Sequence, residues 1–364
     1  MDRVRIGLIG AGIIGGTHSA VLHQICQAMP DRVELVAVAD LDQERRDFFT
    51  AAYGYRQSFV DSRAVIEHPD VNTVFVCVPT SQHAATVYAA AKRGLQIFCE
   101  KPLAMSYAEG KKMLAAVERA GVRTQIGLVL RYSAVYTVMR SLLQDPAAGS
   151  PVAVVFRDDQ CFPIRGLHFS AWRADRSQTA GGTLIEHGVH DLDLLTWMFG
   201  SVRRLRAWEQ NRAGHAGIED YLAAEIEFET GVRAQLVNVW HDVLQRHSNR
   251  RLEIFCQQAF IASNHDMAGT ITCQFGDGAE NRMAEDEVLR RYTAVAGELP
   301  ESLRTLAGVA YLVQDLAFVN ALLHGREPHP SMRVGLEAQR LAEAVYHAAR
   351  SHEEVDLASF RAAG

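Results

Sequence analysis

The chain of 364 residues is long enough for about two domains with cores of their own. It carries 37 Lys and Arg against 43 Asp and Glu, a formal charge of −6, and 48% of its residues are hydrophobic. This composition argues against a disordered chain and against a strongly basic protein that binds nucleic acid. The longest apolar runs, such as 74–79, are too short to cross a membrane.

The apolar segment 4–16 follows Arg3 and could be read as a secretion signal. Its repeated glycines disfavour a signal helix, so we interpret it as a buried strand followed by a glycine-rich turn. The six cysteines show no C-x-x-C spacing. We therefore expect free thiols in a reducing, cytoplasmic setting.

From residue 3 to 127, short β-branched runs alternate with helical stretches. Alternation of this kind requires crossover connections and predicts a parallel sheet covered by helices on both faces. We expect a Rossmann-type, doubly wound domain over 1–127. The expected strands are 4–10, 33–40, 72–79, 95–100 and 122–128, and the expected helices are 16–29, 42–53, 81–93 and 106–120.

After about residue 128 the strand-like runs follow one another with short turns, and Thr230-Gly231 marks a hairpin. This succession of strands joined by short turns predicts an α+β domain over 128–364, built on a large, mainly antiparallel sheet. The polar stretch 276–300 is expected to be a surface excursion or a flexible loop. The last helix, about 332–350, is amphipathic and is a candidate to pack back on the first domain. The expected strands are 151–160, 202–209, 219–229, 231–240, 250–256, 258–263 and 269–275, with further helices at about 184–199 and 302–324.

The segment Gly10-Ala11-Gly12-Ile13-Ile14-Gly15 matches the G-x-G-x-x-G pattern between a hydrophobic strand and a helix. The first glycine permits a tight turn, the second lets the backbone approach a pyrophosphate, and the third allows the helix to pack on the strand. The helix start, at Ile13 and Ile14, offers backbone N–H groups to the phosphates. This context predicts a dinucleotide site.

Asp40 ends the strand that comes 25 residues after Gly15. An acidic side chain there accepts hydrogen bonds from the adenosine ribose and repels a 2′-phosphate, which favours NAD over NADP. Leu41 and Asp42 follow in place of Arg or Lys and favour NAD further. The alternative is that Asp40 only caps the helix that begins near Gln43.

The segment Cys99-Glu100-Lys101-Pro102 directly follows an apolar strand and should lie at the carboxyl edge of the sheet, where cofactors bind. The proline restrains Lys101 and gives a positioned ammonium beside a nicotinamide, with Glu100 as a further cofactor-binding candidate. The alternative is a surface lysine at a strand end, since function depends on a pKa and a geometry that the sequence does not contain.

Residues 181–195 (GGTLIEHGVHDLDLL) predict a helix that carries Glu186, His190 and Asp193 on one face. A carboxylate beside a histidine raises its basicity, as a general base requires. One alternative is a solvated polar face. Another is a metal site with His187 as a ligand, which the missing H-E-x-x-H order disfavours, so we expect no metal.

Taken together, the sequence resembles the glucose–fructose oxidoreductase, inositol dehydrogenase and rhizopine-catabolism superfamily, Gfo/Idh/MocA, over nearly its full length. The motifs that carry the resemblance are GAGIIGGTH at 10–18, the segment 67–104 that ends in CEKPLA, GGTLIEHGVHDLDLLTWMFG at 181–200, and the ending at 328–349. By this resemblance Lys101 matches the catalytic lysine, and its bond to Pro102 is often cis in the family. His190 matches the histidine that exchanges a proton with the substrate hydroxyl.

The resemblance assigns further residues. Glu186, a third catalytic candidate beside Lys101 and His190, falls where many members carry Asp, an extra methylene that could reshape the sugar pocket. The loop beside the nicotinamide matches Pro79, Thr80 and His83. Substrate contacts are implied for Lys101, Arg131, Trp172, Arg173, Glu186 and His190.

The implied function is an NAD-dependent dehydrogenase that oxidises a ring hydroxyl of a sugar, sugar derivative or inositol to a ketone. Homodimers or homotetramers formed through the sheet of the second domain are also implied. The family leaves two alternatives, because a fold does not fix a function. One is an NAD-dependent glycosidase with transient redox chemistry, and the other is a non-catalytic regulator that senses NAD or a sugar. Retention of Lys101 and His190 favours the dehydrogenase.

Overall fold

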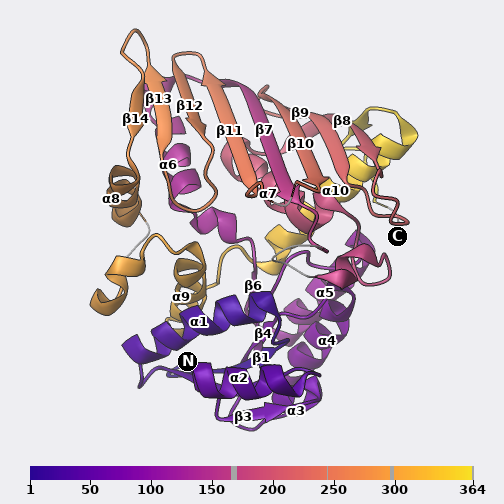
Figure 1. The fold of residues 1–364 in the computed structure, drawn as a ribbon, viewed down its shortest axis with the longest axis vertical. Helices are drawn as coiled ribbons and strands as arrows, with labels where there is room; N and C mark the ends of the chain where they lie inside the picture. The colour runs from indigo at the N-terminus through magenta and orange to yellow at the C-terminus, as the bar shows by residue number, and fades with distance from the viewer. Residues whose placement is uncertain (165–169, 244, 296–298, 363–364) are drawn as a thin grey trace. The chain divides into compact units, whose positions relative to one another are not determined.

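The computed structural model describes residues 1–164, 170–243, 245–295 and 299–362, and these fall into two compact units. The first unit holds residues 1–128, 299–307 and 311–337. The second holds the described residues of 129–295 together with 308–310 and 338–362. Each unit is built on one sheet (Figure 1).

The sheet of the first unit has six strands in the order β3-β2-β1-β4-β5-β6, and every neighbouring pair is parallel. This order, which reverses at β1, confirms the predicted Rossmann fold. The short edge strand β3 was not predicted, because its three partly exposed residues carry too little apolar pattern. The strands are β1 (Val4–Ile9), β2 (Val33–Ala39), β3 (Gln57–Phe59), β4 (Thr73–Val76), β5 (Gln96–Cys99) and β6 (Thr124–Ile126).

Helices cover both faces of this sheet. One apolar cluster joins the sheet to α1 (Ile13–Ala28), α2 (Gln43–Tyr53) and α9 (Ala310–Leu323). The opposite cluster joins it to α3 (Ser62–Ile66), α4 (His83–Arg93), α5 (Tyr107–Ala120) and the first residues of α10 (Met332–Ser351). Strands enclosed in this way read as nearly continuous apolar runs, which is why the sequence located them well.

The first unit takes in more of the chain than the segment 1–127. Leu312, Leu316 and Phe318 of α9 are buried against the Rossmann sheet, and so are Met332 and Leu336 at the start of α10. The chain therefore returns to this unit over 311–337. The start of α10 packs where the sequence had made it a candidate to pack, whereas α9 lies outside the predicted boundary of 1–127. An apolar helix face does not reveal which of two sheets it covers.

The sheet of the second unit has nine strands in the order β14-β13-β12-β11-β7-β10-β9-β8-β15. The β7–β10 pair is parallel and the other pairs are antiparallel, which confirms the predicted, mainly antiparallel sheet. Gly231, with φ of 85°, makes the turn between β9 and β10. The strands are β7 (Pro151–Cys161), β8 (Val202–Gln210), β9 (Tyr221–Phe228), β10 (Arg233–His241), β11 (Asn249–Cys256), β12 (Ala259–Ser263), β13 (Ile271–Phe275), β14 (Asn281–Met283) and β15 (Val355–Asp356).

Two helices of this unit were not predicted, namely α6 (Ala134–Leu143) and α8 (Glu285–Val295). The expectation of a flexible loop over 276–300 was therefore wrong for the described residues, since this stretch contains β14 and α8, whereas 296–298 lie outside them. The physical reason is that α8 begins with three acidic residues, pairs Arg290 with Asp286 and Arg291 with Glu287, and buries Val288. Its few apolar side chains made the segment look like a loop.

The helix expected at 302–324 is divided. A 3₁₀ turn over Glu301–Leu306 precedes α9, and Gly308 lies between them. The helix expected at 184–199 begins as a π-helical turn, Leu184–Gly188, and continues as α7 (Val189–Phe199).

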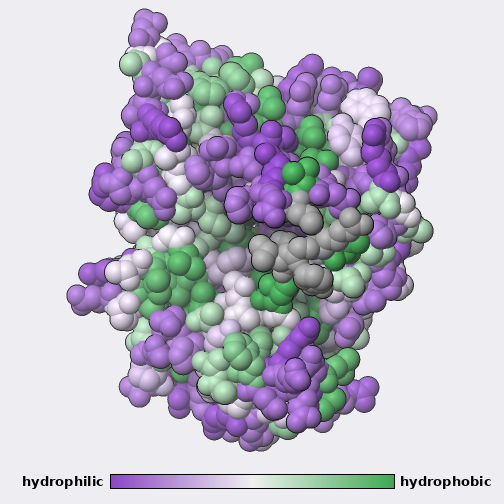
Figure 2. Space-filling view, viewed as in Figure 1, coloured by the Kyte–Doolittle hydropathy of each residue, from purple (hydrophilic) through white to green (hydrophobic). Residues whose placement is uncertain are grey.

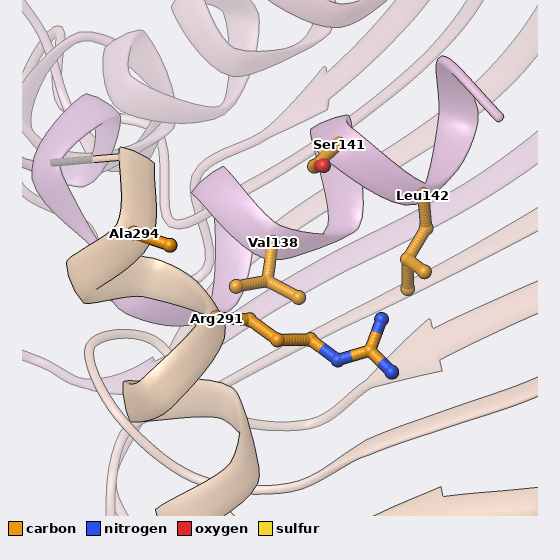
Figure 3. Close-up of a pocket in the computed structure, with 5 residues that line it drawn as sticks. All are labelled: Val138, Ser141, Leu142, Arg291 and Ala294. Atoms are coloured by element: carbon orange, nitrogen blue, oxygen red, sulfur yellow. The ribbon is translucent and has the colours of Figure 1, made fainter.

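A cavity of about 210 Å³ between α6 and α8 is lined by Val138, Leu142 and Arg291, among others, and by none of the predicted site residues (Figure 3).

Among the residues that the structure describes, no helix combines the length and the apolar character that a membrane span requires. Figure 2 shows hydrophilic and hydrophobic side chains interspersed on the face in view. The six cysteines are free thiols, as predicted, and Cys77 and Cys99 are buried.

Candidate active site

The glycine-rich turn holds three glycines with different surroundings. Gly10 has φ of 100°, and a Cβ there would lie 2.5 Å from the carbonyl oxygen of Cys77. A Cβ on Gly15 would lie 2.1 Å from the carbonyl oxygen of Gly10, whereas one on Gly12 would meet nothing within 4 Å. The fold itself therefore requires Gly10 and Gly15, and the space at Gly12 is open to a ligand.

The helix after this turn begins at Ile13, with Ile14 in its first turn, and no described side chain caps it. Its N-terminal N–H groups and its dipole suit the phosphates of a dinucleotide. The residues present thus fit the NAD that the sequence predicts.

Asp40 connects the end of β2 to the same turn. Its Oδ2 accepts a hydrogen bond from the backbone N–H of Ala11 at 2.7 Å, and its Oδ1 accepts one from the backbone N–H of Asp42 at 2.9 Å. The cap of α2 is Asp42, which accepts from the N–H of Arg45, so the alternative that Asp40 caps this helix was wrong. An ionised carboxylate has about four acceptor positions, which leaves Asp40 capacity for ribose hydroxyls.

Lys101 lies just past β5, and its peptide bond to Pro102 is cis. His83 joins this segment to the loop after β4, because Nδ1 lies 2.9 Å from the carbonyl oxygen of Pro102 and Nε2 lies 2.9 Å from that of Val78. Burial lowers the pKa of His83, although the hydrogen bonds to these carbonyl oxygens act in the opposite direction. Pro79 precedes the 3₁₀ turn Thr80–Gln82, and Thr80 is buried in it.

Glu100 lies in the interior of the first unit. Its Oε2 accepts the backbone N–H of Lys101 at 3.1 Å, and its Oε1 lies 3.1 Å from Nε2 of His18. A Cβ on Gly127 would lie 2.3 Å from Oε1, so the glycine leaves room for the carboxylate. The predicted contact of Glu100 with the cofactor remains a prediction.

In the second unit, the predicted polar face of 184–199 is buried. Glu186 is 0% exposed, His190 7% and Asp193 2%, so the alternative of a solvated face was wrong. The π-helical turn inserts extra backbone before α7 and shifts the register of the faces that an ideal helix predicts. π-helical turns of this kind are frequent at functional sites.

Glu186 belongs to a network with two of its neighbours. Its Oε2 accepts from Nε of Arg173 at 2.9 Å, and its Oε1 accepts from the hydroxyl of Thr179 at 2.6 Å. Arg173 also lies 4.5 Å above the ring of Trp172, a cation–π contact. The structure thus brings together three of the predicted substrate residues.

The helix that carries His190 is held by its two aspartates. Asp193 accepts two hydrogen bonds from Arg131, at 2.8 and 2.7 Å, and Asp191 accepts from Arg250 at 2.7 Å and from Asn238 at 2.6 Å. Arg131, predicted to contact substrate, therefore has a structural partner on α7. Arg250 and Asn238 were missed, because nothing near them in the sequence points to α7.

Arg250 faces two further carboxylates, Asp158 at 3.0 Å and Asp266 at 2.9 Å. Burial raises the pKa of Asp158 to about 8 and also raises that of Asp191, although Arg250 acts in the opposite direction. One guanidinium thus fixes several elements beneath α7.

Glu219 holds the glycine pair that precedes the π-helical turn. Its carboxylate accepts from the N–H groups of Gly182 at 2.7 Å and Leu184 at 2.9 Å, and from the hydroxyl of Tyr346 at 2.8 Å. A Cβ on Gly182 would lie 1.9 Å from the carbonyl oxygen of Glu219, which explains the glycine there. The sequence around Glu219 carries no signal of this role, because its partners are 35 or more positions away.

Trp240 donates its indole N–H to Nδ1 of His187 at 2.8 Å. Because indole is only a donor, this nitrogen of His187 carries no proton. Trp240 also lines a cavity of about 490 Å³ with Tyr221 and His241, at the ends of β8, β9 and β10.

Among the described residues, no group of three or more His, Cys, Asp or Glu side chains is arranged to hold a metal ion.

Two family models match the chain. The oxidoreductase family model, NAD-binding Rossmann fold, matches residues 4–128, and the GFO/IDH/MocA C-terminal domain model matches residues 136–262. The chain belongs to the Gfo/Idh/MocA family. It is accordingly an oxidoreductase whose first unit is an NAD-binding domain, and this confirms the family, enzyme class and cofactor predicted from the sequence.

Named relatives of the chain act on polyols and sugars. It is 25% identical over 362 residues to the inositol 2-dehydrogenase of Rhizobium meliloti (strain 1021), covering 98% of this chain and 99% of the relative. It is 28% identical to the D-apiose dehydrogenase of Paraburkholderia graminis, covering 100% and 92%. A levoglucosan dehydrogenase solved with NADH and levoglucosan has the same fold, with a TM-score of 0.85, 21% identity and coverage of 98% and 99%.

The glycine-rich turn gives the first testable prediction. Gly15→Ala should lower the melting temperature of the protein without NAD, because the new methyl group overlaps the carbonyl of Gly10. Gly12→Ala should leave that temperature within about 1 °C of the wild type, because the site is open, but should weaken NAD binding at least about tenfold by occupying the space for the pyrophosphate. Thermal unfolding and an NAD titration measure the two effects. A Gly12→Ala protein with normal NAD affinity would contradict this division of roles.

The second prediction concerns Glu219, whose pKa burial raises from 4.5 to about 7. An acid whose pKa is raised by folding favours the folded state at low pH, and this contribution is lost as pH rises from 4.5 through 7, by roughly 3 kcal/mol at most. Glu219→Gln should flatten the pH dependence of the free energy of unfolding in that window. It should also lower stability by about 1–3 kcal/mol, because an amide cannot accept at both atoms.

Urea unfolding between pH 4.5 and 8 tests this, with Glu225→Gln on the exposed side of β9 as the matched control. The control should follow the wild type. An equally steep pH dependence in Glu219→Gln would show that other groups produce it.

Proposed function

We propose that the protein oxidises a ring hydroxyl of a sugar, sugar derivative or inositol to a ketone, with NAD as hydride acceptor. The observation that carries this proposal is His190, an imidazole on a buried helix whose neighbouring aspartates are both paired with arginines. A fixed imidazole in such a setting suits a general base better than a surface role. The named relatives, which include an inositol and an apiose dehydrogenase, support the class of substrate.

In this proposal His190 takes the proton of the substrate hydroxyl. The ammonium of Lys101 stabilises the negative charge that develops on the same oxygen, and it polarises the carbonyl when the reaction runs as a reduction. NAD, when bound, accepts the hydride from the carbon. Arg173 and Trp172 orient the ring by contacting its other hydroxyls, Glu186 takes part through its hydrogen bond with Arg173, and Arg131 is a further contact.

The residues assigned to NAD divide into two groups. Those of the glycine-rich turn and the end of β2 bind the pyrophosphate and the adenosine ribose. Those after β4 and β5 lie at the carboxyl edge of the sheet, beside the nicotinamide. The first group is Gly10, Gly12, Ile13, Ile14, Gly15 and Asp40, and the second is Pro79, Thr80, His83, Glu100 and Lys101.

The test follows reduced-nicotinamide absorbance with NAD across inositols, aldoses, sugar acids and glycosides. Lys101→Ala and His190→Ala should each lower kcat by about 10²–10⁴-fold on the active compound, the usual contribution of positioned acid–base groups. Lys112→Ala, an exposed lysine of α5, is the control and should keep full activity. Full activity in either site variant would remove that residue from the mechanism.

Absence of turnover by a protein that binds NAD would reject the dehydrogenase. The same panel would then be assayed for glycoside cleavage without net NAD reduction, the mark of the redox glycosidase. A ligand that binds without being changed would indicate a regulator.

We also propose that the protein forms homodimers or homotetramers through the sheet of the second unit. On one face of this sheet Val155, Trp208 and Phe255 are 39%, 49% and 44% exposed. An open sheet face with such residues suits a symmetric contact between copies. Light scattering should give two or four times 40.3 kDa, and Trp208→Asp should lower this mass, whereas Phe48→Asp on α2 should not. A monomer at all concentrations would overturn this.

A further inference from the structure

A buried histidine of the first unit lies between two carboxylates, and the reaction proposed above gives it no role. His18, in α1, is 0% exposed. Its Nδ1 lies 2.8 Å from Oδ2 of Asp315 on α9, and its Nε2 lies 3.1 Å from Oε1 of Glu100 at the end of β5. The ring thereby connects three segments that are far apart in the sequence.

Both ring nitrogens face acceptors, so the ring satisfies both carboxylates only as an imidazolium. Burial alone would lower the pKa of His18, but Asp315 and Glu100 outweigh it and raise the pKa to about 10. The rings of Phe75, Phe98 and Tyr311 contact the ring of His18 at centroid distances of 5.5, 4.9 and 5.7 Å, in tilted or edge-on arrangements.

Other buried titratable groups interact with the two carboxylates, namely Cys77 and Cys99 with Glu100 and Tyr55 with Asp315. Burial raises the pKa of all three, so they stay neutral across the physiological range. The charge balance around His18 is therefore set by Asp315 and Glu100.

The ring acts on Lys101 through Glu100. One carboxylate oxygen of Glu100 meets His18 and the other accepts the backbone N–H of Lys101, so the orientation of the carboxylate fixes that N–H. Gly127 leaves the carboxylate its space, since a Cβ there would overlap Oε1. His18 lies on the same helix as the glycine-rich turn, three residues after Gly15.

We infer that His18 and Asp315 are positioning residues for Lys101, and that through Glu100 they hold its backbone in place relative to the helix that begins the NAD site. His18 is fully buried, so it acts through Glu100 and not on the substrate itself. The inference rests on the proposed function, because Lys101 is the catalytic lysine in that proposal.

The test uses His18→Gln and Asp315→Asn in the full chain. A glutamine amide meets two carboxylates with one donor and one acceptor end, so it breaks one of the two connections. Asparagine removes the charge of Asp315 but still hydrogen-bonds Nδ1, a milder change. We expect kcat to fall about 10–100-fold in His18→Gln and about threefold to tenfold in Asp315→Asn, with KM for substrate and for NAD within about threefold of the wild type.

A second readout does not depend on turnover. The chain has four lysines, Lys92, Lys101, Lys111 and Lys112, so reductive methylation with ¹³C-formaldehyde gives few resonances. Lys101→Arg identifies the resonance of Lys101. In the protein without NAD, both variants should move this resonance and leave the other three in place.

Unchanged kcat and an unchanged Lys101 resonance in folded His18→Gln would overturn the inference. If that variant does not fold, Asp315→Asn decides by the same two measurements. A merely structural role would instead lower stability and move all four resonances or none, with kcat per folded molecule unaltered. If the wild type turns over no compound, the proposed function fails, and the Lys101 resonance alone decides about His18 and Asp315.

Discussion

Buried carboxylates hold the candidate site residues of each unit in place. In both units, acidic side chains are removed from water and paired with a cation or with backbone N–H groups. Moving such a group out of water costs several kcal/mol, which is recovered only when its hydrogen bonds are well formed. The pairing therefore tolerates little displacement, and it fixes the segments that it joins.

The two units apply this constraint in different ways. In the first unit, Glu100 links the segment of Lys101 to α1 and α9 through a histidine. In the second unit, Asp191 and Asp193 link α7 to arginines. Glu219 accepts a hydrogen bond from the backbone N–H of Gly182, in the glycine pair that precedes the π-helical turn. Replacing such pairs by apolar side chains often increases stability, so stability alone does not account for them. Their common effect is to orient the segments that carry Lys101 and His190.

The sequence predicted most of what is local. The Rossmann strands were found because two-sided burial leaves apolar runs, and the glycine-rich turn was found because its spacing reflects steric needs along one stretch of backbone. It did not predict the contacts between side chains that are far apart in the sequence. Arg250, Glu219 and Asp315 look like ordinary polar residues until the fold brings their partners close, and α9 could have covered either sheet. The spacing of apolar residues over 184–199 also gives no indication of the π-helical turn before α7.

The division of labour along α7 has a consequence for how the protein can change. The side chains that attach this helix to its unit are Asp191 and Asp193, whereas His190 and Glu186 occupy other positions of the same segment. A replacement of Glu186 leaves these attachments intact, so the surroundings of Arg173 can change while α7 stays in place. Replacements at the attachments strand a buried arginine and require a second, compensating change. A change in the compound that the protein binds is therefore expected to pass through Glu186 and the Trp172–Arg173 pair that it contacts, with the aspartates unchanged.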